Sequence, residues 1–163
     1  MRISTLAILS LLTVAACGGS TSTPAAPTTT SAGTVASLSG TWTGTSSDSS
    51  GQDKMIWTLS QNANTTSGTM NISDTTRSMM GNGSMQGTIS GSTMTFHMTV
   101  PTGGFDGMMA ACSMGVDGQA TMSSDGHAMT GTYSGTMSGM MSGGMMGQAC
   151  GGAMNNGQFT LTR

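Results

Sequence analysis

The sequence predicts an all-β protein: a single up-and-down antiparallel eight-stranded β-barrel, preceded by a signal peptide and a disordered tether. The first reason is that apolar and polar residues alternate with period two in eight short segments between residues 38 and 163, as in half-buried strands. The second is that breaks rich in Gly, Asn and Asp separate these segments, which is typical of tight turns. Short consecutive strands joined by turns favour a meander that closes as a barrel.

Residues 1–16 have the features of a secretory signal peptide. Arg2 precedes an apolar run from Leu6 to Ala16, which is too short to span a bilayer as a permanent helix. The run leads into Val14-Ala15-Ala16-Cys17, which resembles the lipobox of bacterial lipoproteins. The resemblance implies that Cys17 becomes the first residue of the mature chain and carries acyl groups such as palmitate. An ordinary cleavable signal would leave its thiol free.

Residues 17–37 are predicted to form a lipidated, disordered linker. The stretch from Gly18 to Ser37 contains two prolines and few large side chains, so it cannot bury enough apolar surface to fold. Gly18 also stands where an aspartate would favour the inner membrane, so the lipoprotein resemblance implies an outer-membrane anchor facing the periplasm. The folded domain is expected at 38–163, a length that can close one core.

The expected strands place apolar side chains on one face and Thr, Ser, Asn and Gln on the other. They lie at residues 38–46, 54–61, 66–73, 83–90, 92–100, 116–123, 128–136 and 157–163. The apolar face comprises Leu38, Trp42, Met55, Trp57, Leu59, Met70, Ile72, Met85, Ile89, Met94, Phe96, Met98, Met122, Met129, Tyr133, Phe159 and Leu161. Glycines take further places on this face and let strands coil sharply, namely Gly40, Gly44, Gly68, Gly87, Gly131 and Gly135.

The start of the first expected strand, Gly40-Thr41-Trp42, resembles the Gly-x-Trp motif of lipocalins and the wider calycin group. This resemblance implies a lipocalin-like barrel domain at 38–163. It also implies that Trp42 packs at the closed end of the barrel beneath an arginine near the last strand, for which Arg163 is the candidate. The second lipocalin motif, Thr-Asp-Tyr, is echoed only by Ser124-Asp125. Trp42 could alternatively be a core residue with no such partner.

Composition and motifs argue against several classes of function. The formal net charge is −2 without a basic cluster, which excludes nucleic acid as an expected partner. His97 falls on the outward face of its strand and His127 in a short turn, so both are expected to be solvated. The chain has no nucleophile elbow, phosphate loop or zinc-protease motif. We therefore expect no enzyme activity, no catalytic residues, no cofactor and no metal held by these histidines.

Once Cys17 is lipidated, two cysteines remain in an oxidising compartment. Alternate connections of an up-and-down barrel lie at the same end, and Cys112 and Cys150 lie in the fifth and seventh connections. The two can therefore meet, and a structural disulfide is predicted. Metal-binding thiols are the alternative.

Methionines concentrate at the same predicted end of the barrel. They lie in the third, fifth and seventh connections or beside them: Met79, Met80, Met108, Met109, Met114, Met137, Met140, Met141, Met145, Met146 and Met154. The expected result is a methionine collar around one mouth. The connections at the opposite end contain no methionine.

Two functions compete for this collar. Methionine is an adaptable hydrophobe, so the collar is predicted to bind a small apolar ligand or another envelope protein. Thioether sulfur also favours Cu(I), so a periplasmic copper-binding protein is the alternative. A third interpretation gives the collar no specific role, since methionine also replaces Leu and Val within the strands. The remaining expected partner is the membrane, through the lipid anchor.

The lipobox generates the first testable prediction. Changing Cys17→Ser should remove the acyl mass and release the protein from the membrane fraction, because a serine hydroxyl cannot take the thioether-linked lipid. Mass spectrometry and fractionation measure both effects. Wild-type protein that is already soluble after export would contradict the predicted membrane anchoring.

Overall fold

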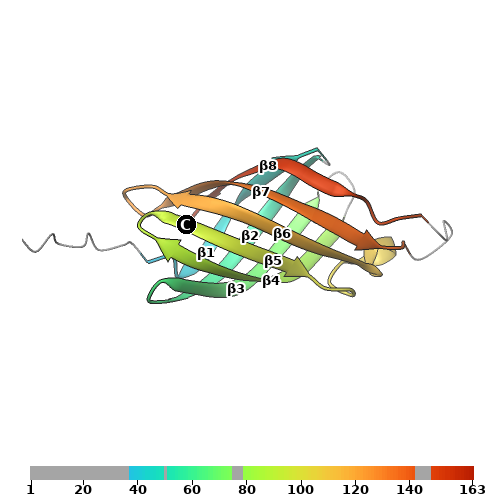
Figure 1. Ribbon diagram of the computed structural model, residues 1–163, viewed down its shortest axis with the longest axis horizontal. Coiled ribbons are helices and arrows are strands. Elements are labelled where there is room, and N and C mark those ends of the chain that lie inside the picture. The colour runs from blue at the N-terminus through green and yellow to red at the C-terminus, as the bar shows by residue number, and fades with distance from the viewer. Residues whose placement is uncertain (1–36, 50, 75–78, 142–147) are drawn as a thin grey trace, which may run out of the picture. The chain divides into compact units, whose positions relative to one another are not determined.

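The computed structural model describes residues 37–49, 51–74, 79–141 and 148–163. Eight antiparallel strands follow one another around a closed barrel, and the last pairs with the first (Figure 1). They are β1 (Gly40–Asp48), β2 (Gly51–Asn62), β3 (Thr65–Asp74), β4 (Met79–Ser90), β5 (Thr93–Val100), β6 (Cys112–Met122), β7 (Ala128–Gly139) and β8 (Ala153–Thr162). The predicted fold class is confirmed. No helix among the described residues has the length and apolarity to cross a bilayer.

Seven strands, all but β5, extend further toward one end of the barrel than the sequence predicts. Residues that we expected in connections belong instead to β4, β6, β7 and β8: Met79, Met80, Cys112, Met114, Met137 and Met154. Their backbone groups are satisfied by the neighbouring strand, as in the pairing of Met114 with Met137. The Gly- and Met-rich sequence of these ends has low intrinsic strand propensity, so the partner strand decides their conformation.

The inward faces of the strands fill most of the barrel. Every apolar residue expected on the inner face is buried or, for Ile72, half-buried. The most deeply buried large side chains are Trp42, Trp57, Leu38, Met70, Met85, Met94, Met98, Met129, Leu161, Val100 and Val116. An eight-stranded barrel has room for little more than its own side chains, so this part of the interior is a packed core.

Aromatic rings inside the barrel lie over glycines on the adjacent strand. In each of three pairs the glycine is the direct cross-strand partner of the aromatic residue, and a Cβ built on the glycine would overlap the ring: Phe96 with Gly118, Phe159 with Gly131, and Tyr133 with Gly157. The glycine thus makes room for a ring that would otherwise not fit between two strands. Of the glycines expected on the apolar face, Gly131 has this role, whereas a Cβ on Gly44 or Gly68 would meet the backbone of the neighbouring strand.

Trp57 is the centre of the resulting aromatic cluster. Its ring centroid lies 5.3 Å from that of Phe96 and 5.0 Å from that of Phe159, both in tilted or edge-on arrangements. Such geometry is favourable because ring edges carry positive and ring faces negative partial charge. Within the described part of the chain, the buried indole N–H of Trp57 has no hydrogen-bond acceptor. Apolar packing alone therefore holds this ring.

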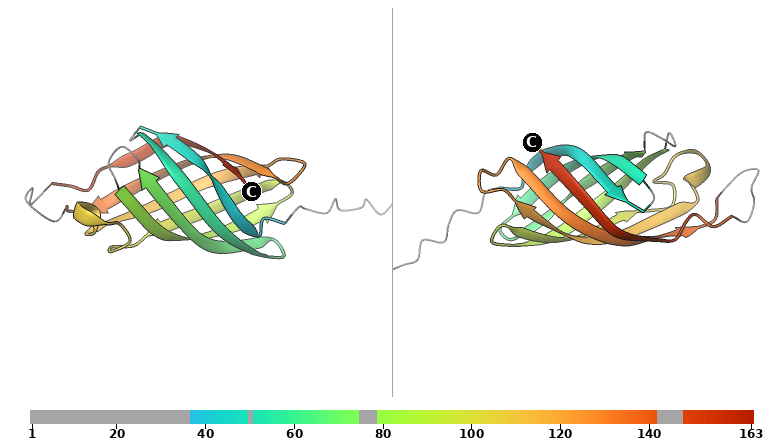
Figure 2. Two further views of the ribbon diagram at one scale, coloured as in Figure 1. Left: turned by 180° about the vertical axis from the view of Figure 1, so that it is seen from behind. Right: turned by 90° about the horizontal axis from the view of Figure 1, so that it is seen from above.

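The end of the barrel near the C-terminus is closed by Trp42 and Arg163. The Arg163 Cζ lies 4.8 Å from the Trp42 ring centroid, which is the cation–π contact that the lipocalin resemblance implies. Arg163 also donates to the carbonyl oxygens of Ser37 and Ser39, and Trp42 Nε1 donates to the Leu38 carbonyl at 2.8 Å. Both views in Figure 2 place this end opposite the short 3₁₀ helix η1 (Gly107–Met109).

The ring-over-glycine packing predicts a sharp contrast between two glycines of β6. Gly118→Ala should lower the free energy of unfolding by about 2 kcal/mol or more, because the new methyl group would overlap the Phe96 ring and the Thr132 carbonyl. Gly115→Ala is the matched control, since a Cβ there meets nothing within 4 Å. It should change stability by less than about 1 kcal/mol. Urea unfolding monitored by fluorescence measures both, and equal effects would contradict the packing argument.

Candidate functional site

A cavity of about 950 Å³ opens at the end of the barrel that carries η1. Its walls come from the ends of β2, β3, β4, β6, β7 and β8, together with η1 and residues 148–152. We call it the mouth cavity. The connection before η1 folds against β4, where the Asn82 N–H donates to the Gly104 carbonyl at 2.7 Å. This contact places Phe105 over Gly81, so the ring forms part of the apolar wall.

The apolar lining of the mouth cavity is mainly methionine. Among the described residues it comprises Ile72, Phe105, Met79, Met108, Met109, Met114, Met137, Met141 and Met154. Five of the methionines are partly buried and pack against the core: Met79, Met109, Met137, Met141 and Met154. We call these the five lining methionines. The structure therefore brings together side chains that the sequence places in separate segments.

Two methionines of the predicted collar do not line the cavity. Met80 is 51% exposed and Met140 is 62% exposed. Each follows or precedes a methionine that lines the wall, and successive side chains of an extended chain point to opposite faces. Adjacent pairs such as Met79-Met80 therefore cannot both face inward. Met145 and Met146 lie outside the described residues, as does Cys17.

The predicted disulfide joins Cys112 at the start of β6 to Cys150, in the wall of the mouth cavity. The S–S distance is 2.01 Å and the Cα–Cα distance is 5.7 Å, so this prediction is confirmed. Both cysteines are buried, and the Cys112 Sγ lies 3.7 Å from the Met109 Sδ. Backbone pairing continues beside the disulfide, since the Cys150 N–H donates to the Gly139 carbonyl. The disulfide thus fixes one wall of the cavity to the barrel.

Three carboxylates also line the mouth cavity. Asp53 and Asp74 are direct cross-strand partners on β2 and β3, both line the cavity, and Asp74 is only 6% exposed. Asp106 lines the cavity at the start of η1, next to Phe105. Sequence reasoning missed this feature, although the alternation that places Met55 and Ile72 inward also places Asp53 and Asp74 inward. Asp74 is also the direct cross-strand partner of Met79, so the acidic groups lie among the apolar side chains of the lining.

Tyr133 marks the boundary between the packed core and the mouth cavity. Its ring packs over Gly157, and its hydroxyl donates to the Asp48 Oδ2 at 2.8 Å. Burial and the Asp48 hydrogen bond raise the pKa of Tyr133 well above its ordinary value. The phenol therefore stays protonated and acts as a hydrogen-bond donor. On β7, the inward positions that follow Tyr133 toward the mouth cavity are Gly135 and then Met137.

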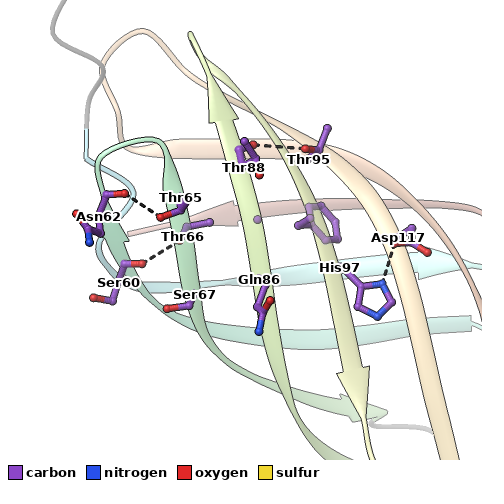
Figure 3. A pocket seen from close by; sticks show the side chains of 12 residues that line it. Ser60, Asn62, Thr65, Thr66, Ser67, Gln86, Thr88, Thr95, His97 and Asp117 are labelled. Atoms are coloured by element: carbon purple, nitrogen blue, oxygen red, sulfur yellow. Dashed lines mark hydrogen bonds and ion pairs between the residues drawn. The ribbon is translucent and has the colours of Figure 1, made fainter.

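The outer wall of the barrel carries a second, shallower hollow (Figure 3). Hydroxyl and amide side chains of β2 to β5 surround it, and its titratable residues are His97 and Asp117. His97 Nδ1 lies 2.7 Å from Asp117 Oδ1, and His97 Nε2 lies 3.2 Å from Thr99 Oγ1. His97 is 57% and Asp117 79% exposed, as expected for solvated residues. Thr99, His97 and Asp117 follow one another as hydroxyl, imidazole and carboxylate, which is the order in a hydrolytic triad. Solvent surrounds these three groups, however. The nearby backbone N–H groups, which an oxyanion hole would require, are engaged in strand pairing.

The donors available at the mouth cavity limit its metal chemistry. No group of three or more His, Cys, Asp or Glu side chains is placed to hold a metal ion within the described ranges. Thioether sulfur is the remaining donor type that several lining residues share. The mouth cavity is thus suited to apolar contact or to a soft metal, and less to a hard cation.

Comparison with protein-family models and with curated proteins gave no match to this chain. The interpretation of the mouth cavity therefore rests on its own residues.

The disulfide predicts a measurable contribution to stability. Changing both Cys112→Ala and Cys150→Ala should lower the free energy of unfolding by about 4 kcal/mol, because the disulfide closes a loop over a separation of 38 residues. Urea unfolding of the oxidised wild type and the double variant measures the difference. Wild type unfolded in the presence of a reductant should lose a similar amount. A double variant as stable as oxidised wild type would contradict the prediction.

Proposed function

We propose that this protein is a non-enzymatic binding module of the cell envelope that holds a small apolar ligand in the mouth cavity. The observation that carries the proposal is the methionine-lined cavity above a filled barrel. Its volume of about 950 Å³ lies within the range of small-molecule sites, roughly 300–1,000 Å³. Side chains fill the barrel between Tyr133 and the end closed by Trp42 and Arg163. The ligand would therefore bind at the mouth and not deep in the interior.

The methionine lining supports an apolar ligand of variable shape. Methionine is unbranched and polarizable, so its side chain can adjust to different apolar surfaces. The five lining methionines are partly buried, which leaves apolar surface that a ligand could cover. Phe105 and Ile72 add rigid surface to the same wall. A single rigid pocket shape is not required for this kind of recognition.

The charged groups restrict the ligand further. The described lining contains Asp53, Asp74 and Asp106 but no lysine, arginine or histidine. A ligand with an anionic head group would be repelled by these carboxylates. We therefore infer that the ligand is neutral or cationic, and an uncharged apolar probe is the appropriate first test.

The proposed localisation follows from the sequence features of residues 1–37. Residues 1–36 lie outside the described part of the chain. We infer an outer-membrane lipoprotein anchored through Cys17, with a lipocalin-like domain facing the periplasm. The barrel supports one part of this proposal: the chain enters β1 at the closed end, where Arg163 contacts the Ser37 carbonyl. An anchor attached there would leave the mouth cavity accessible to a ligand or to another envelope protein.

Cu(I) binding is the second candidate function. It is favoured by one observation, namely that thioethers from β4, η1, β6, β7 and β8 line a single cavity. Several thioethers can together coordinate Cu(I), which prefers soft ligands. The two cysteines of the barrel form the disulfide, so they would not contribute thiolates in this state.

Leucine and serine replacements of the five lining methionines separate the two candidates. Leucine keeps apolar bulk but lacks a sulfur lone pair, so a variant with all five changed to leucine should lose Cu(I) binding, measured against a competing chelator. Its affinity for an uncharged apolar probe should stay within about tenfold of wild type, because such swaps usually cost under roughly 1.5 kcal/mol. Serine replacements of the same five residues should lower the affinity for the probe by more than about tenfold. The full chain carrying Cys17→Ser avoids interference from detergent.

The control variant changes Met80→Leu and Met140→Leu, which are the described methionines of the predicted collar that do not line the cavity. It should match wild type in both measurements. Near-UV circular dichroism checks that the serine variant remains folded, and the single change Met137→Ser provides a milder version. Wild-type protein that binds neither Cu(I) nor the probe would defeat both candidate functions.

A further inference from the structure

We propose that oxidation of methionine to methionine sulfoxide abolishes ligand binding in the mouth cavity. Two-electron oxidants, such as hypochlorous acid or hydrogen peroxide, would convert its methionines to sulfoxides and so release an apolar ligand. This inference rests on the proposed function for its consequence. The modification itself follows from where the methionines lie.

Exposure divides the described methionines into three groups. Met80, Met108 and Met140 are 51%, 62% and 62% exposed. The five lining methionines are partly buried. The remaining described methionines are buried and therefore shielded: Met55, Met70, Met85, Met94, Met98, Met114, Met122 and Met129. An oxidant must contact the sulfur, so oxidation should proceed from the rim to the lining and reach the core last.

No thiol of the barrel competes for the oxidant. Cys112 and Cys150 are joined in the disulfide, and both are buried. Thiolates normally react with such oxidants in redox-sensing proteins. With the thiols already oxidised, the accessible sulfur of the described residues is thioether. Redox sensitivity of the mouth cavity would therefore reside in its methionines.

The reaction with hypochlorous acid balances without a further reactant. The thioether sulfur gives an electron pair to the oxygen, the O–Cl bond breaks, an S–O bond forms, and chloride and a proton leave. With hydrogen peroxide the O–O bond breaks and water leaves. In both cases sulfur is oxidised by two electrons and the oxidant is reduced. The product is a methionine sulfoxide, which methionine sulfoxide reductases can return to methionine.

Sulfoxides would change the cavity from apolar to polar. Each adds a strong hydrogen-bond acceptor to a wall that now offers a thioether, and an apolar ligand cannot satisfy it. The lining already carries Asp53 and Asp74, and Asp74 is the cross-strand partner of Met79, so an oxidised cavity would hold water in preference to an apolar ligand. The packed methionines of the core remain shielded, and the barrel therefore stays folded while its ligand leaves.

Peptide mass mapping tests the order of oxidation without any ligand. The full chain carrying Cys17→Ser is treated with increasing molar ratios of hypochlorous acid, and the gain of oxygen at each methionine is measured. We expect Met80, Met108 and Met140 first, then the five lining methionines, with the core methionines last. Oxidation of the core methionines at the same ratio as the lining would overturn the proposal.

Probe binding tests the consequence. Oxidation of the lining should lower the affinity for the uncharged apolar probe by at least about tenfold. The near-UV circular dichroism spectrum of the oxidised protein should stay unchanged. The five-leucine variant, with Met108→Leu added because Met108 also lines the cavity and is exposed, should keep its affinity for the probe after the same treatment, while the Met80→Leu and Met140→Leu variant should lose it as wild type does. Methionine sulfoxide reductases should restore wild-type binding.

The failures of the two proposals are distinguishable. Untreated wild type that binds no apolar probe would overturn the proposed apolar-ligand function, and with it the release step, whatever the oxidation map shows. Oxidised wild type that retains full affinity, or a five-leucine variant with Met108→Leu that loses affinity equally, would overturn the proposed effect of oxidation while leaving the binding function intact.

Discussion

Inside the barrel, the rings of Phe96, Phe159 and Tyr133 each lie over a glycine of the adjacent strand, and the rest of the structure depends on this packing. An eight-stranded barrel is barely wide enough for its inward side chains. Directly paired glycines create the room that large rings need. The rings in turn surround Trp57 and fill the interior as far as Tyr133. The position of the cavity follows, because the barrel can be open only where this packing ends.

Above Tyr133 the inward residues change in kind. The inward residues there are Met137, Met154 and small residues on β7 and β8, and Asp53, Asp74 and Ile72 on β2 and β3, while Phe105 places one further ring in the wall. Flexible thioethers do not fill a barrel end as tightly as stacked rings, so a cavity remains between them. The disulfide then holds its wall in place. The candidate site is therefore the part of the barrel that the core packing leaves unfilled.

The same methionines link recognition with chemistry. As apolar side chains they suit a ligand of variable shape, as soft ligands they suit Cu(I), and as thioethers they are open to oxidation. These properties depend differently on position, because in our proposals the partly buried methionines would be covered by a ligand, whereas the exposed ones would meet oxidants first. Closure by Trp42 and Arg163 at the far end leaves one entrance to the interior, away from the point where the chain enters β1.

The sequence by itself determined the eight strands, their inward faces, the disulfide and the end at which methionines gather. Period-two alternation and the order of connections are local or topological properties, so they can be read without coordinates. Only the tertiary structure decided where the strands end at the mouth, since the Gly- and Met-rich ends extend because a neighbouring strand supplies their hydrogen bonds. It also decided that Met79 lines the cavity while Met80 does not, and that Asp53 and Asp74 face each other inside it. Those outcomes depend on register and closure, which residues far apart in the chain set together.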